Sequence, residues 1–131
     1  AGLGPTHHAN EDISFLKSIP NMQVICPADP NEVRKALHKA IKTKGPIYFR
    51  LGKKGEKNID LLKNHKFKIG KSTRLTFGDD IAILSTGTIL ADAVDSYYFL
   101  KKKNINSSIF HFATVKPLDL KIKHILATHS I

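Results

Sequence analysis

Short apolar runs alternate with amphipathic segments along this chain, and this alternation limits the possible folds more than any other feature. Apolar runs at 22–26 and 47–51 enclose the segment 29–40, whose apolar residues recur at helical spacing. The same pattern returns between residues 81 and 112. A strand, a helix and a second strand in this order form a βαβ unit, whose two strands are parallel. We therefore predict an α/β fold built from two partial parallel-sheet βαβ units.

Local signals set the ends of several helices. Residues 29–32 (Asp-Pro-Asn-Glu) place an N-cap acid, a proline at the first helical position and a glutamate at the third, as in a capping box. An earlier helix is expected over 10–17, ended by Pro20. Asp119 is expected to cap a last helix that runs to Leu126.

A lysine-rich segment without clear periodicity separates the two units. We interpret 53–78 as a linker, with a short strand near 67–69. This divides the chain into a first domain over 1–52 and a second over 79–131. A chain of 131 residues is about the size of one domain, so each unit is expected to be part of a larger sheet.

Composition excludes several classes of protein. The chain has no long apolar run, so we expect no membrane association, and its lone Cys26, in an apolar run, fits a buried thiol in a cytoplasmic protein. The formal net charge of +10 could suggest nucleic-acid binding. However, the lysines are spread along the whole chain and no known RNA- or DNA-binding motif is present, so we expect no nucleic-acid partner.

Several short motifs together resemble transketolases. They occur in the order and at the spacing of that family: Gly4-Pro5-Thr6-His7-His8, Glu11-Asp12-Ile13, Ile19-Pro20-Asn21-Met22, Pro27-Ala28-Asp29-Pro30-Asn31-Glu32-Val33, Gly45-Pro46-Ile47-Tyr48-Phe49-Arg50-Leu51-Gly52, Ser85-Thr86-Gly87 and Thr114-Val115-Lys116-Pro117-Leu118-Asp119. The resemblance implies that 1–52 is the latter part of the pyrimidine-binding domain. It also implies that 79–131 is a truncated transketolase C-terminal domain.

The resemblance further implies a cofactor and partners that this chain does not supply. Transketolases use thiamine diphosphate and Mg²⁺ to transfer a two-carbon ketol unit between sugar phosphates. The diphosphate site and the glutamate that activates the cofactor precede the Gly-Pro-Thr-His motif in the family. We therefore expect the chain to be inactive alone and to work with a missing N-terminal section or subunit, as a homodimer or a two-subunit assembly.

Two histidines are candidate site residues. The resemblance implies that His7 faces the substrate, where an imidazole that titrates near neutral pH suits proton transfer to and from sugar hydroxyls. His7 could instead cap the helix that begins near Asn10, although the motif favours the catalytic role. His8 is a substrate-side candidate, although a position behind the site or on the surface is the favoured interpretation, because family members vary there. No further ligands are spaced to make this pair a metal site.

The resemblance implies that two basic residues after the second strand hold a substrate phosphate, because transketolases and deoxyxylulose-phosphate synthases place basic residues there. Arg50 can bind it through its bidentate fork, and Lys53 can bind it as a point charge or be a solvated loop residue. Leu3 departs from the family, because ordinary transketolases have an aspartate there that bonds a sugar hydroxyl. This difference suggests a divergent branch of the family that acts on modified sugars.

Other functions remain open. Within the family, the chain could belong to a 1-deoxyxylulose-5-phosphate synthase. It could also be a non-catalytic subunit that only forms an interface. In addition, backbone amides at Ser85-Thr86-Gly87-Thr88 could bind an anion, although a tight strand-to-helix turn explains the same glycine.

Overall fold

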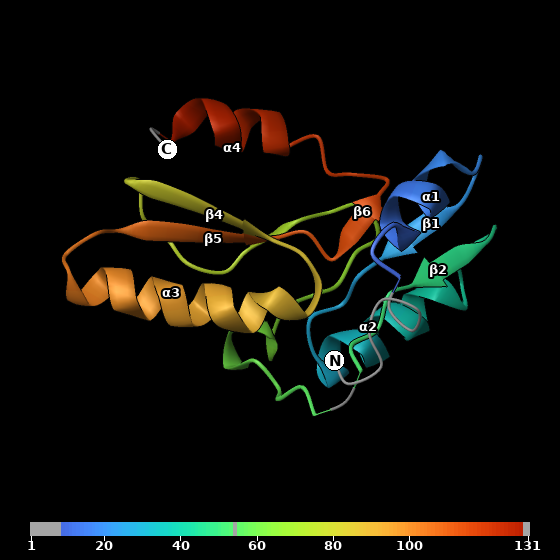
Figure 1. Ribbon diagram of the computed structural model, residues 1–131, viewed down its shortest axis with the longest axis horizontal. Coiled ribbons are helices and arrows are strands. Elements are labelled where there is room, and N and C mark those ends of the chain that lie inside the picture. Colours follow the sequence, from blue (N-terminus) through green and yellow to red (C-terminus); the bar gives the residue numbers. More distant parts are fainter. Residues whose placement is uncertain (1–8, 54, 130–131) are drawn as a thin grey trace.

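The computed structural model describes residues 9–53 and 55–129, and it contains two small sheets with helices on their faces (Figure 1). In chain order the elements are α1 (Asp12–Ser18), β1 (Gln23–Ile25), α2 (Pro30–Ala40), β2 (Ile47–Phe49), η2 (Asp60–Leu62), β3 (Thr73–Arg74), β4 (Ile81–Ser85), η3 (Gly87–Ile89), α3 (Leu90–Lys102), β5 (Ser107–His111), β6 (Thr114–Lys116) and α4 (Ile122–Thr128). Apart from a strand expected near 67–69, the expected strands and helices are present, most of them within two residues of their predicted ends.

Both predicted βαβ units are confirmed. β1 pairs with β2 in parallel, with Val24 opposite Tyr48, and β4 pairs with β5 in parallel, with Ile83 opposite Ile109. Each sheet also has a third, antiparallel strand that the sequence did not predict, so the strand orders are β2-β1-β6 and β3-β5-β4. Because β6 follows β5 in the chain yet joins β1, the late part of the sequence completes the early sheet.

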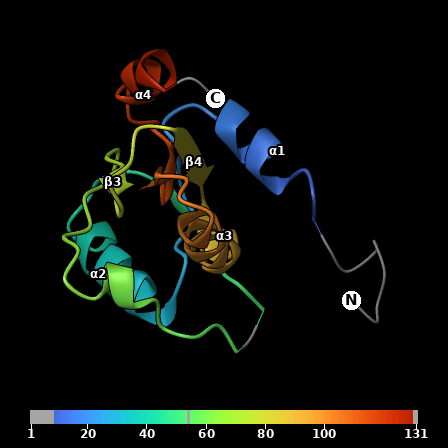
Figure 2. The same cartoon turned by 90° about the vertical axis from the view of Figure 1, so that its left-hand side faces the viewer.

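The helices cover opposite faces of the sheets. α3 lies below β4 and β5 in Figure 1 and α4 lies above them. Turning the molecule shows α1 and α2 on opposite sides of it (Figure 2). Two main core clusters lie around Ile25 and Ala36 and around Leu90 and Ile109, and a third, smaller one includes Ile125 of α4. Parallel strands need cover on both faces, which explains this layering.

The start of α2 follows its predicted capping signal with one change. The Asp29 side chain accepts a hydrogen bond from the Glu32 backbone N–H at 2.7 Å, as an N-cap acid should. The Glu32 side chain reaches back to the backbone N–H of Ala28 at 2.8 Å, one residue before the cap, instead of to Asp29. Both carboxylates are almost completely buried, so this helix start is also part of the interior.

The lysine-rich segment is packed against the body. Leu62 is buried in the cluster around Leu90, and Phe67 is buried in the cluster around Ile25. The Asp29 carboxylate accepts a hydrogen bond from the backbone N–H of Ile59 at 2.8 Å. The Lys35 ammonium group donates to the carbonyl oxygens of Leu62, Lys63 and His65 at 2.8–3.0 Å. The prediction of a strand near 67–69 was wrong. Phe67 is a core side chain outside any strand, and β3, later in the chain, pairs with β5.

Asp119 does not cap the last helix as predicted. α4 has Lys121 as its N-cap residue, and Asp119 is buried two positions earlier. Its carboxylate accepts hydrogen bonds from the Ser72 backbone N–H at 2.9 Å and from the Lys121 backbone N–H at 3.1 Å. The segment before β3 and the segment before α4 are joined by this side chain, a contact between residues far apart in sequence.

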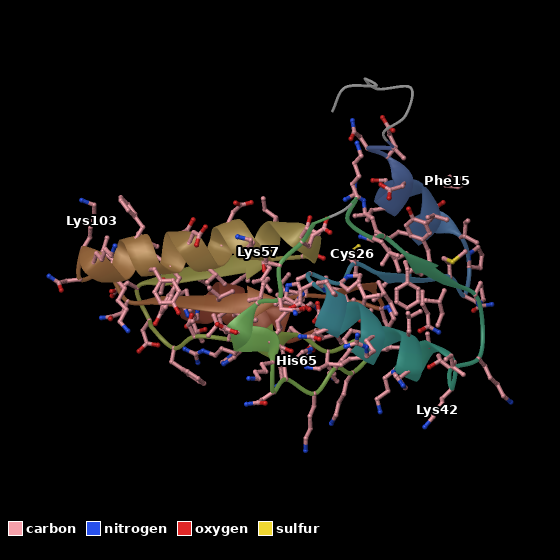
Figure 3. All side chains as sticks on the ribbon, turned by 90° about the horizontal axis from the view of Figure 1, so that it is seen from below. Phe15, Cys26, Lys42, Lys57, His65 and Lys103 are labelled. Carbon is pink, nitrogen blue, oxygen red and sulfur yellow. The ribbon has the colours of Figure 1, made fainter. Side chains whose placement is uncertain are left out.

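Basic side chains are distributed over the molecule. Lys42 and Lys103 project from its two ends, and Lys57 lies between them on the lysine-rich segment (Figure 3). Lys116 instead points inward and donates to the carbonyl oxygens of Lys17 and Ile19 at 2.8 and 2.6 Å, where it caps the end of α1. None of the described helices is both long and apolar enough to cross a membrane.

Candidate substrate-binding site

A cavity of about 550 Å³ lies where the end of β2, the beginning of α1 and the start of η3 meet. Its polar lining comes from Asn10, Asp12, Tyr48, Arg50, Lys53, Glu56 and Thr88. Arg50 directly follows β2 and Lys53 comes three residues later, so both stand beyond the carboxyl end of a parallel strand pair. Ligands in α/β sheets bind at this edge. The geometry therefore brings the two predicted basic residues to one hollow.

Arg50 is fixed by a carboxylate. Its Nε donates to both oxygens of Asp12, at 2.9 Å to Oδ2 and 3.2 Å to Oδ1, and the Tyr48 hydroxyl donates to Asp12 Oδ2 at 2.8 Å. Burial by itself would raise the pKa of the Asp12 carboxyl, but the hydrogen bonds from Tyr48 and Arg50 outweigh it and hold that pKa below its ordinary value. The bond to Asp12 raises the pKa of the Tyr48 phenol. Asp12 is therefore an anion with two fixed donors.

The other predicted site residues have different outcomes. Lys53 lines the same cavity and is exposed. His7, His8 and Leu3 lie outside the described residues. Ala9, which directly follows His8 in the sequence, also lines the cavity, and its carbonyl oxygen lies 3.5 Å from Arg50 Nη2.

The turn before α3 is occupied by a structural contact. The Gly87 backbone N–H donates to the carbonyl oxygen of Cys26 at 3.0 Å, and Thr86 Oγ1 donates to the carbonyl oxygen of Phe112 at 2.7 Å. Gly87 has φ of +65°, a conformation that favours glycine. The glycine amide therefore ties this turn to the end of β1, which favours the packing interpretation over the anion site. Cys26 itself is buried, and burial raises the pKa of its thiol.

A buried polar cluster is a feature that the sequence did not reveal. Glu32 Oε1 accepts from His65 Nε2 at 3.1 Å, and Glu32 Oε2 accepts from His111 Nε2 at 2.9 Å. The other ring nitrogens lie 3.1 Å from Thr73 Oγ1 and 3.2 Å from Ser85 Oγ. With Nε2–H donating from both rings, each Nδ1 can accept from a hydroxyl, so the whole chain of groups is satisfied.

This cluster has a strongly stabilised anion at its centre. Burial would raise the pKa of Glu32, but the hydrogen bonds from His111, His65 and the Ala28 amide outweigh it and lower the pKa to about 2. The three side chains come from α2, the lysine-rich segment and β5, and His111 is 79 positions from Glu32 in sequence. No spacing rule connects such residues; two isolated histidines were the only signal.

The described residues offer no metal centre. Within 9–53 and 55–129, no group of three or more His, Cys, Asp or Glu side chains could hold a metal ion. The Glu32 cluster is no exception, because both imidazoles direct a nitrogen at the carboxylate itself.

Comparisons with known proteins show which family the sequence and the fold resemble. The sequence profile of the transketolase pyrimidine-binding domain matches residues 1–56. The chain is 33% identical over 118 residues to the uncharacterized transketolase family protein y4mN of Sinorhizobium fredii, covering 90% of this chain and 34% of that protein. It superposes on a split-gene transketolase, described as an inactive beta4 tetramer, with a TM-score of 0.83 and 31% identity over 94% of this chain and 40% of that one. The chain belongs to the transketolase family.

A transketolase-family relative with another activity is equally similar. The 1-deoxy-D-xylulose-5-phosphate synthase of Dictyoglomus thermophilum is 35% identical over 131 residues, 98% of this chain and 21% of that protein. The chain thus spans between about a fifth and two fifths of the length of these proteins. It is a transketolase-like section from thiamine-diphosphate-dependent families.

Proposed function

We propose that this chain supplies the substrate-facing section of a transketolase that transfers a two-carbon ketol unit between sugar phosphates, and that it is inactive alone. One observation carries the proposal. Arg50 and Lys53 line a single cavity with Ala9, the residue that follows the Gly-Pro-Thr-His-His motif. The two candidate phosphate-binding residues and the residue that follows the candidate histidines thus line one cavity.

The chemistry of each side chain suggests a separate role in binding the substrate or in proton transfer. Arg50 can hold a phosphate oxygen through its fixed guanidinium, and Lys53 adds a mobile charge. His7 would give and take protons at sugar hydroxyls, and His8 would contact the substrate beside it. When bound, thiamine diphosphate supplies the carbanion that accepts the ketol unit. We assign no cofactor- or Mg²⁺-binding group to the described residues, and propose that those groups lie in another section.

The assembly would follow the division of the chain. We propose that 1–52 completes a pyrimidine-binding domain, 53–78 joins the domains and 79–131 belongs to the C-terminal domain. Several large apolar side chains are exposed, among them Phe15, Phe77 and Ile41 at 64%, 78% and 83%. Such surfaces are typical of protein contacts. The proposed partner is the N-terminal transketolase section, on the same or another polypeptide.

A test of the proposal is activity with and without that section. The purified chain, given thiamine diphosphate, Mg²⁺ and xylulose 5-phosphate with an acceptor aldose, should show no turnover. Adding the N-terminal section should restore ketol transfer. Turnover by the chain alone, or an assembled complex that holds cofactor but transfers nothing, would contradict the proposal.

His7→Ala in the complete enzyme should lower kcat by about 100-fold, a typical contribution of a general acid–base group. Steady-state kinetics with matched cofactor occupancy would measure this. The exposed His38→Ala, remote in sequence and on α2, is the control and should keep the parent kcat. Unchanged kcat in a folded His7 variant would leave His7 as a helix-capping residue.

A second candidate function is 1-deoxyxylulose-5-phosphate synthesis. The synthase relative, aligned over almost the whole chain, favours it. Formation of 1-deoxyxylulose 5-phosphate by the assembled enzyme, without ketol transfer between sugar phosphates, would establish this alternative.

A further inference from the structure

Three side chains near the cavity form a linear set of contacts: Tyr48 hydroxyl to Asp12, and Asp12 to the Nε edge of Arg50. Asp12 is 10% exposed while the Arg50 side chain is 45% exposed. The carboxylate in the middle is therefore less exposed than the arginine, which extends from it toward solvent. Such a carboxylate fixes the arginine instead of competing freely for ligands.

The terminal nitrogens of Arg50 remain accessible. Among the described residues Nη1 has no hydrogen-bond partner, and Nη2 has only the 3.5 Å contact to the Ala9 carbonyl oxygen. Asp12 occupies Nε, so the fork that remains is formed by the two Nη groups. A tetrahedral oxyanion binds such a fork through two of its oxygens.

The charges in the cavity lining show why orientation should matter. The lining contains two cationic side chains, Arg50 and Lys53, and two acidic ones, Asp12 and Glu56. These formal charges cancel, so net charge alone gives an anion little attraction. Binding must then depend on where the donors point, and a donor held in place loses less conformational entropy when the ligand arrives.

We propose that Tyr48 and Asp12 are positioning residues that aim the Arg50 guanidinium at the phosphate of the substrate. The inference rests on the proposed function, in which Arg50 holds that phosphate. Tyr48 acts only through Asp12. Removing its hydroxyl leaves every charge in place and loosens the carboxylate that orients the arginine.

The experiment uses the complete enzyme and the variants Tyr48→Phe, Arg50→Ala and the double variant. Tyr48→Phe should raise KM for xylulose 5-phosphate by about 3- to 10-fold, the effect of losing one net hydrogen bond. It should leave kcat within about twofold, leave KM for unphosphorylated xylulose unchanged, and weaken competitive inhibition by inorganic phosphate to the same degree. In the Arg50→Ala background Tyr48→Phe should have no further effect, because the group it positions is gone.

The control is Tyr98→Phe, which removes a half-exposed hydroxyl on α3 outside this cavity and should change neither constant. Asp12→Asn provides a second variant and should also raise KM for the phosphorylated sugar selectively. If Arg50→Ala raises that KM but Tyr48→Phe leaves it unchanged, or acts equally in both backgrounds, the positioning inference is wrong and the proposed function stands. If Arg50→Ala itself leaves KM for the phosphorylated sugar unchanged, the phosphate role of Arg50 in the proposed function fails.

Discussion

Glu32→Ala is expected to lower the free energy of unfolding by about 3–5 kcal/mol, because it leaves three buried hydrogen-bond donors without their acceptor and each such donor costs about 1–3 kcal/mol. The substitution removes the acceptor of two imidazoles and of the Ala28 amide, all at a site where the Glu32 side chain is completely buried. Urea denaturation of the purified protein at neutral pH would measure the loss. Glu11→Ala, at an exposed residue whose side chain makes no cap hydrogen bond, is the control and should change stability by less than about 0.5 kcal/mol.

The same cluster predicts a dependence on pH. The folded protein lowers the pKa of Glu32 from its ordinary value of 4.5 to about 2. A depressed carboxyl pKa stabilises the fold above pH 4.5, and this contribution, about 3 kcal/mol, is lost as pH falls from 4.5 toward 2. The stability difference between the parent and Glu32→Ala should therefore narrow below pH 4.5. A difference under about 1 kcal/mol at neutral pH would show that the cluster contributes little.

Leu62→Ala should destabilise the protein by about 2–5 kcal/mol, because a large buried side chain is removed and a cavity remains. Leu62 is completely buried and packs with Ala28, Leu90 and Ile109, which come from both halves of the chain. Thermal and urea unfolding would measure this loss.

The matched control is Leu120→Ala, at a side chain that is 75% exposed, which should change stability by less than about 0.5 kcal/mol. The comparison tests whether the lysine-rich segment is part of the core. If both substitutions have equally small effects, the segment is a dispensable connection and its packing in the structure does not contribute to stability.

Local sequence signals predicted most elements because their causes are local. The sequence predicted a buried strand over five residues, and β4 in the structure has the same bounds, Ile81–Ser85. The α2 start is fixed by Asp29 and Pro30, neighbours that act within one helical turn. Where the cause was not local the prediction failed, as for the strand near 67–69 and for Asp119, whose partner Ser72 is 47 positions away.

The candidate site was predictable only in part. Arg50 and Lys53 were selected because the resemblance places basic residues after the second strand, and the structure shows both in the lining of one cavity. Their role in binding phosphate stays a prediction. The roles of His7 and His8 stay predictions. Asp12 and Tyr48 could not be assigned to Arg50 from the sequence. Asp12 is 38 positions from Arg50, and Tyr48 contacts the arginine only through Asp12.

The sequence by itself determined the two βαβ units and the family motifs, since hydrophobic period, capping and turn residues act over a few positions. Only the tertiary structure decided how the units join. β6 pairs with β1, and the lysine-rich segment contributes buried side chains to the two main core clusters. Glu32 accepts hydrogen bonds from His65 and His111. These contacts depend on chain segments brought together by burying apolar surface and by satisfying buried polar groups, and neither requirement leaves a fixed spacing in the sequence.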